Sequence, residues 1–114
     1  MKTVTVGISL DALAALADGR FGDLVKAVTD LGRGIMVVDA DMHADEEAVL
    51  LDDGSLQADL WGINLYPQRF GTPDFIEFDS MINVRPRQGN RSRAVENAAD
   101  REAIAALVAR LVTP

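Results

Sequence analysis

The chain has 114 residues, a net charge of −7 and no cysteine. This length supports one hydrophobic core, so we expect a single domain spanning 1–114, and the absence of cysteine excludes disulfides, thiolate metal sites and cysteine nucleophiles. The negative charge disfavours binding to nucleic acid, because affinity for nucleic acid depends on neutralising phosphates.

The N-terminal part of the chain predicts one strand and two helices. Residues 2–8 alternate apolar and polar side chains, which is typical of a short strand. Ser9 is a suitable N-cap for a helix that ends near Gly19. The segment 22–31 carries apolar residues at helical spacing and precedes Gly32, a common residue after a helix C-terminus. These patterns predict a strand followed by two helices.

From Gly34 onward the apolar period changes to two, which predicts a β-meander. Its four strands are expected at 34–38 (with an extension as far as Met42), 48–51, 58–65 and 75–84. The segment Asp52–Ser55 has the composition of a hairpin turn, since Gly54 accepts positive φ at little cost. A last helix at about 98–112 follows Asn97, which is a suitable N-cap.

The fold class expected from these elements is α+β. The element order is β-α-α-β-β-β-β-α, and its consecutive strands are joined by short connections. Short connections between strands predict a mainly antiparallel sheet, and the apolar stripes of the helices need a sheet face to cover. We therefore expect helices packed on one face of an antiparallel sheet.

The most polar part of the chain is the segment 75–93. Strand alternation in 75–84 places one apolar set of side chains on the face toward the helices: Ile76, Phe78, Ile82 and Val84. The opposite face continues into a loop rich in arginine and amide groups. Arginine binds carboxylate or phosphate through two parallel hydrogen bonds, so this face predicts an anion site. The ligand-binding residues expected there are Glu77, Asn83, Arg85, Asn90 and Arg91.

The acidic run 39–47 contains the only histidine of the chain, His43. Histidine is the side chain whose ordinary pKa suits proton transfer near neutral pH. The candidate catalytic residues are accordingly His43, Asp45, Glu46 and Asp79. Imidazole and carboxylates also suit a divalent metal, but ligands from a second segment would be required, so we assign no metal site.

Several motifs resemble a bacterial family of small proteins classed as a domain of unknown function. They are FGDLVKAV, HADEEAVLLDDGS, LWGINLYP and FDSMINVRPRQGNRSR, and they cover most of residues 21–93. Asp39 lies outside the shared pattern, so the candidate site residues of the acidic run are expected within 43–47. The resemblance implies no activity, cofactor or partner.

Two classes of function fit these observations. The first is a protein that binds a small molecule or an anion such as phosphate or carboxylate, with a hydrolase that uses His43 as general base as its enzymatic form. The second is an interaction module without catalysis, in which the arginine-rich loop docks on the acidic run of another copy or another protein. No stretch has the length of a membrane span and the N-terminus lacks a signal-peptide pattern, so we expect a cytoplasmic protein. The cofactor is left unassigned.

Overall fold

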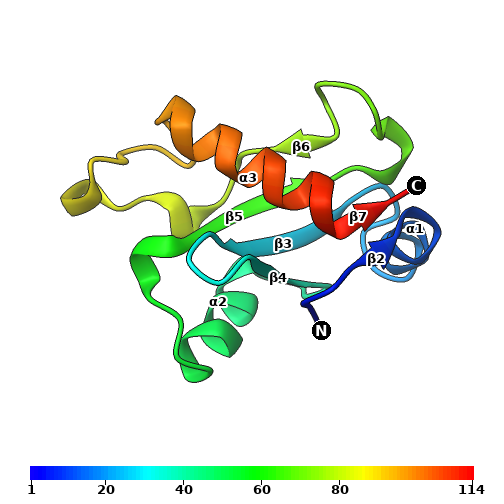
Figure 1. Cartoon of the computed structure of the whole chain (residues 1–114), viewed down its shortest axis with the longest axis horizontal. Coiled ribbons are helices and arrows are strands. Elements are labelled where there is room, and N and C mark those ends of the chain that lie inside the picture. The colour runs from blue at the N-terminus through cyan, green and yellow to red at the C-terminus, as the bar shows by residue number, and fades with distance from the viewer.

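The computed structural model describes residues 1–114 and is built on a five-stranded antiparallel sheet (Figure 1). The strands of this sheet, in spatial order, are β1 (Lys2–Val4), β4 (Ile35–Val38), β3 (Val25–Asp30), β5 (Leu60–Leu65) and β6 (Ile76–Glu77). A small parallel pair joins β2 (Ile8–Ser9) to β7 (Val112–Thr113). The expected α+β class with a mainly antiparallel sheet is confirmed.

Three α-helices and four short 3₁₀ turns complete the chain. The helices are α1 (Leu10–Asp18), α2 (His43–Asp52) and α3 (Ala98–Leu111). The 3₁₀ turns are η1 (Gln57–Asp59), η2 (Pro67–Arg69), η3 (Met81–Asn83) and η4 (Pro86–Gln88). No helix combines the length and the apolar character needed to cross a bilayer.

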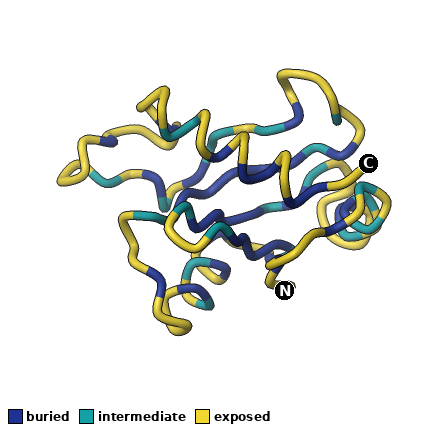
Figure 2. Tube along the Cα trace, in the orientation of Figure 1, coloured by how far each residue is buried: buried dark blue, intermediate teal, exposed yellow.

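The sheet has helices on both faces rather than on one. On one face, residues of α1 and α3 such as Leu13 and Ile104 pack with Ala27 and Ile63 in the larger core cluster. On the other face, Leu50 of α2 packs with the second cluster, which includes Val28 of the central strand. Figure 1 shows α3 in front of the sheet and α2 behind it. Buried backbone accordingly follows β3, β4 and β5 (Figure 2).

The helix expected at 22–31 is wrong, because this segment forms the central strand β3. Both neighbours of β3 are strands, and Val28 pairs with Val37 on one side and Gly62 on the other. The polar residues of β3, Lys26, Thr29 and Asp30, do not fall on alternate positions because both faces of the strand are largely buried, so a period of two is hidden. The β-branched residues Val25 and Val28 are the local signal that favours a strand.

The strand expected at 48–51 is also wrong, since these residues belong to α2. The Asp53-Gly54 pair ends this helix instead of turning a hairpin. The N–H of Asp53 donates to the carbonyls of Val49 and Leu50, and Gly54 has φ of 97°. A glycine with positive φ is favoured after a helix C-terminus as well as in a hairpin turn, so the local sequence fits both structures.

The long strand expected at 75–84 is wrong beyond Glu77. After β6 the chain turns at Ser80, whose side chain caps η3. The proposed alternation fails because Asn83 is fully buried while Val84 is exposed. The helices at the two ends of the chain agree with expectation, and their N-caps are the expected Ser9 and Asn97.

Candidate functional site

The segment between β6 and α3 is held against β5 by the side chain of Asn83. The N–H of Gly62 donates to Asn83 Oδ1 over 2.8 Å, and Asn83 Nδ2 donates to the carbonyl of Gly62 over 2.9 Å. On this side of β5, strand β6 pairs only with Asn64 and Leu65. The amide of Asn83 therefore replaces the hydrogen bonds that a longer neighbouring strand would make to Gly62.

Gly62 also allows the chain to come close at Ser80. A Cβ placed on Gly62 would lie 2.5 Å from Ser80 Cβ and 2.6 Å from Ser80 Oγ, which real side chains do not tolerate. Only glycine at this position lets η3 pack directly on β5. Gly62 and Asn83 together fix η3 on the same face of the sheet as α2.

The second amide of the loop, Asn90, is also occupied by backbone groups. Its Nδ2 donates to the carbonyls of Asn83 and Ala94 over 2.7 Å each and to Ser92 over 3.1 Å. Its Oδ1 accepts the N–H of Glu96 over 2.9 Å. Asn90 is buried and uses its polar atoms to fold the loop.

Arg85 is engaged in a similar way. Its Nη2 donates to the carbonyl of Leu60 over 2.7 Å, and its Nη1 donates to the carbonyl of Gln57. The guanidinium carbon lies 4.1 Å from the centroid of the Trp61 ring, which is a cation–π contact. Arg85 thus joins the loop to the start of β5.

No ion pair joins the arginine-rich loop to the acidic run. Asp39 and Asp41 both pair with Arg20, at 2.9 and 2.7 Å. In the loop, the exposed Arg91 offers its backbone N–H to the carboxylate of Glu96. No group of three or more His, Asp or Glu side chains is arranged to hold a metal ion.

A pocket of about 270 Å³ lies between the start of α2 and η3, and we call it the α2–η3 pocket. Its polar lining comes from four separate parts of the chain: Lys26, His43, Ser80 and Arg93. No acidic residue lines it, although the chain has 18 acidic and 11 basic residues. The pocket is therefore a cationic region on an acidic protein.

His43 is the first residue of α2, and only 7% of it is exposed. Its Nε2 lies 2.8 Å from the carbonyl oxygen of Ile63. A carbonyl can only accept, so Nε2 carries the proton, and in the neutral ring Nδ1 is the free acceptor. Burial lowers the pKa of His43 below its ordinary value, against the opposing effect of the Ile63 carbonyl. The imidazole is therefore neutral near pH 7.

The two cations of the pocket differ in their partners. Lys26 projects from β3, pairs with no carboxylate, and its Nζ lies 5.2 Å from the centroid of the Phe21 ring. Arg93 Nε lies 2.6 Å from Asp79 Oδ1, and both side chains are partly exposed. Asp79 thus orients Arg93, while the ammonium of Lys26 is free to meet a ligand.

Ser80 and the start of α2 add hydrogen-bond donors. The Ser80 Oγ accepts the N–H of Ile82 over 3.3 Å, and its own hydroxyl proton goes to no protein acceptor. Met42, the N-cap of α2, provides no side-chain cap to the first turn. The start of α2 therefore lies at the pocket without a side-chain cap, and Asp45 is the exposed carboxylate in its first turn.

Glu46 lies behind this pocket and does not line it. The residue is fully buried, and neither carboxyl oxygen has a hydrogen-bond partner. Burial raises the pKa of Glu46 to about 9, with a smaller opposing effect from the backbone of Ala40. Glu46 is consequently a neutral carboxylic acid near pH 7.

The other expected site residues lie around the pocket or away from it. Glu77 accepts from Asn64 Nδ2 over 2.8 Å and from the Tyr66 hydroxyl over 3.1 Å. Asp45 is exposed on α2. Of the nine residues expected from the sequence, His43 alone lines the α2–η3 pocket, and Asp79 contributes through Arg93.

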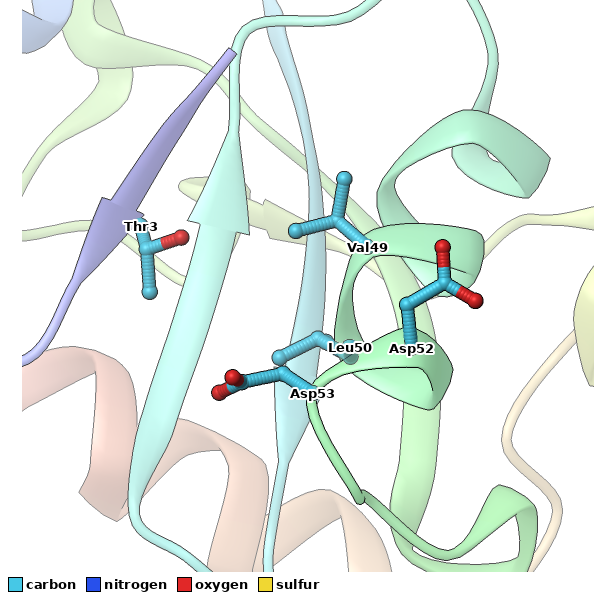
Figure 3. Close-up of a pocket in the computed structure, with 5 residues that line it drawn as sticks. All are labelled: Thr3, Val49, Leu50, Asp52 and Asp53. Atoms are coloured by element: carbon cyan, nitrogen blue, oxygen red, sulfur yellow. The ribbon is translucent and has the colours of Figure 1, made fainter.

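Larger hollows exist elsewhere on the chain. One of about 380 Å³ lies between β1 and the end of α2 and is lined by Thr3, Val49, Leu50, Asp52 and Asp53. In Figure 3 the carboxylates of Asp52 and Asp53 point to opposite sides, and Asp53 pairs with Arg33 at 2.6 Å. Another of about 470 Å³ surrounds Arg85, which is tied to backbone carbonyls. Of the four hollows, the α2–η3 pocket alone brings the histidine together with two cations.

Sequence reasoning missed Lys26, Ser80 and Arg93 as site residues. Lys26 was assigned to a helix, where its direction relative to His43 could not be inferred. The sequence contained one signal that another segment packs closely on β5. This signal is Gly62 in the strand motif LWGIN, because an isolated glycine in a strand indicates a close approach by another segment.

A model of a family described as "Protein of unknown function (DUF5674)" matches residues 2–111. The chain belongs to the DUF5674 family. No curated protein and no solved structure matches the chain. The membership confirms a family of uncharacterised proteins, so the function of this DUF5674 protein has to be argued from its own residues.

Proposed function

We propose that this DUF5674 protein binds a small anion, a phosphate or a carboxylate, in the α2–η3 pocket. The observation that carries the proposal is the lining itself: Lys26 and Arg93 reach the same pocket, and no acidic residue does. In a chain of net charge −7, a concavity with only cationic charge favours an anionic ligand through electrostatic complementarity.

Each polar residue of the pocket has a distinct part in this binding. Arg93, oriented by Asp79, offers the planar donors that match a carboxylate or phosphate. Lys26 adds an unpaired point charge, and Ser80 adds a hydroxyl donor. Nδ1 of His43 accepts a hydrogen bond from a protonated oxygen of the ligand, such as that of hydrogen phosphate.

Titration calorimetry with inorganic phosphate tests the proposal. Lys26→Met keeps the length of the side chain and removes its charge, and we expect it to weaken phosphate binding about tenfold or more. Arg87→Gln removes an exposed arginine outside the pocket and serves as the matched control, with unchanged affinity expected. Equal phosphate affinity in the wild type and Lys26→Met, or no heat and no thermal stabilisation with phosphate, sulfate or acetate, would refute the proposal.

A hydrolytic form of this function is favoured by the protonation state of His43. A neutral imidazole whose Nε2 is held by a carbonyl keeps Nδ1 as its acceptor nitrogen, and we assign Nδ1 as the general base for a ligand in the pocket that His43 lines. We expect hydrolysis of small phosphate or carboxylate esters, with a rate that rises with pH through a pKa below the ordinary histidine value of 6.5.

The variant His43→Gln separates binding from hydrolysis. It should lower ester turnover by about a hundredfold or more, the usual contribution of a general base, while phosphate affinity changes far less. Phosphate binding without any turnover of aryl phosphates or aryl acetates would leave the binding function standing and exclude the hydrolytic one.

A further inference from the structure

We propose that the anion bound in the α2–η3 pocket carries an apolar group, an aryl ring or a short alkyl chain, that is seated between Met42 and Met81. The inference rests on the proposed anion site and specifies its ligand class. The ligand class would then be an aryl or alkyl phosphate or carboxylate, in preference to a free inorganic ion.

The apolar half of the pocket supports this inference. Met42, Ala44, Met81 and Ile82 line it beside the four polar residues. Met42 is 56% exposed and Met81 is 65% exposed, so both present apolar surface to solvent at the pocket. The chain has four methionines, and two of them meet here from different elements, α2 and η3.

Helix capping does not explain why residue 42 is a methionine. It occupies the N-cap position of α2, where serine, threonine, aspartate or asparagine stabilises a helix by bonding its first N–H groups. The other two helices follow this rule with Ser9 and Asn97, and α2 does not. An apolar residue at a position that favours a polar one indicates a second role for the side chain.

Methionine suits the recognition of an apolar group. Its unbranched thioether side chain adapts to irregular shapes and makes favourable contacts with the edges of aromatic rings. Met36 shows the alternative use of the residue, since it is fully buried in the larger core. Two exposed thioethers therefore share one pocket with the cations Lys26 and Arg93.

The pocket volume of about 270 Å³ is near the lower end of the roughly 300–1,000 Å³ typical of small-molecule sites, which suits one ring or a short chain with a single acid group.

The test compares three probes on the full chain labelled at the methionine methyl groups: phenyl phosphate, inorganic phosphate and phenol. We expect phenyl phosphate to bind about tenfold more tightly than inorganic phosphate, because burial of its ring adds to the same anion contacts. Its NMR titration should shift the methyl resonances of Met42 and Met81 and leave that of Met36 unchanged. Phenol alone should bind weakly, since it lacks the charge.

Two variants assign the effect to the methionines. Met42→Gln and Met81→Gln keep the side-chain length, and each should weaken phenyl phosphate binding about fivefold while leaving inorganic phosphate affinity unchanged. Leu56→Gln, another exposed apolar residue at 68%, is the control outside the pocket and should change neither affinity.

The outcomes separate this inference from the anion site on which it rests. Equal affinities for phenyl and inorganic phosphate, or no effect of either methionine variant, would overturn the inference and leave anion binding intact. Absence of binding by both phosphates would overturn both proposals together. A preference for phenyl phosphate that both methionine variants abolish would establish the ligand class.

Discussion

The loop of residues 78–97 contributes Ser80, Met81, Ile82 and Arg93 to the α2–η3 pocket, but the polar side chains in the rest of the loop and those of the pocket are used in different ways. In the loop, the amides of Asn83 and Asn90 and the guanidinium of Arg85 are used by backbone carbonyls and N–H groups. In and behind the pocket, Lys26 has no carboxylate partner and Glu46 has no hydrogen-bond partner. Lys26 lines the pocket and is available to a ligand, whereas Glu46 is fully buried and acts on stability.

The comparison shows that polar composition alone does not identify a binding residue. The loop is the more polar segment, yet its donors and acceptors replace a missing strand beside β5. The pocket residues are fewer and come from distant parts of the chain. Removing a loop residue should therefore cost stability, and removing a pocket residue should change ligand binding or pH response.

The largest expected effect is on the pH dependence of stability and comes from Glu46. Its pKa is about 9 in the folded protein and 4.5 when unperturbed, so the folded state favours the protonated form. Stability from this group is full below pH 4.5 and is lost as pH rises toward 9, at up to about 1.4 kcal/mol per pH unit. Urea denaturation across this range measures the slope.

The isosteric change Glu46→Gln should remove this slope. Asp45→Asn alters an exposed carboxylate on the same turn of α2 and should retain the wild-type slope. If Glu46→Gln and the wild type lose stability in parallel as pH rises, Glu46 is not held neutral by burial.

The next largest expected effect is a loss of stability in the variant Asn83→Ala, which alters the loop. The change removes three hydrogen bonds and leaves the N–H and carbonyl of Gly62 unpaired in a buried place. We expect the free energy of unfolding to fall by about 3 kcal/mol or more. Gln88→Ala removes one exposed hydrogen bond to Ala58 and, in the same denaturation assay, should cost about 0.5 kcal/mol or less. Similar losses for the two variants would contradict the structural role of Asn83.

Gly62→Ala tests the contact between β5 and η3 that supports both regions. The new Cβ would overlap Ser80, so we expect a loss of about 2 kcal/mol in thermal or chemical unfolding. Gly19→Ala is the matched control, because a Cβ there meets nothing closer than 3.6 Å. A Gly62→Ala protein as stable as Gly19→Ala would show that η3 does not pack on β5 as described.

The smallest effects compare two arginines of the same loop. Arg85→Ala loses two carbonyl contacts and the stacking on Trp61, which should cost about 1.5 kcal/mol in a denaturant titration. Arg91→Ala removes an exposed side chain and should change stability by about 0.5 kcal/mol or less. The reverse order would mean that Arg91, rather than Arg85, joins the loop to the body of the protein.

Local patterns were sufficient for part of the fold. The α+β class, strand β4, most of β5, and the helices α1 and α3 with their caps Ser9 and Asn97 followed from the sequence. The two helices each follow a side chain that caps the first turn, and β4 and β5 are rich in apolar, β-branched or aromatic residues although every residue in them is buried. His43 was predicted as a candidate because it is the only histidine, and it lines the α2–η3 pocket.

Tertiary contacts decided the rest. β3 is buried on both faces, so its apolar pattern carried no period of two and matched a helix by coincidence. The role of Asn83 depends on a gap beside β5, 21 residues earlier in the chain, which no local pattern reports. The α2–η3 pocket combines Lys26, His43, Ser80 and Arg93 only after β3, α2 and η3 meet on one face. Sequence determines the local preferences, but which polar groups stay unpaired depends on neighbours that only the folded chain supplies.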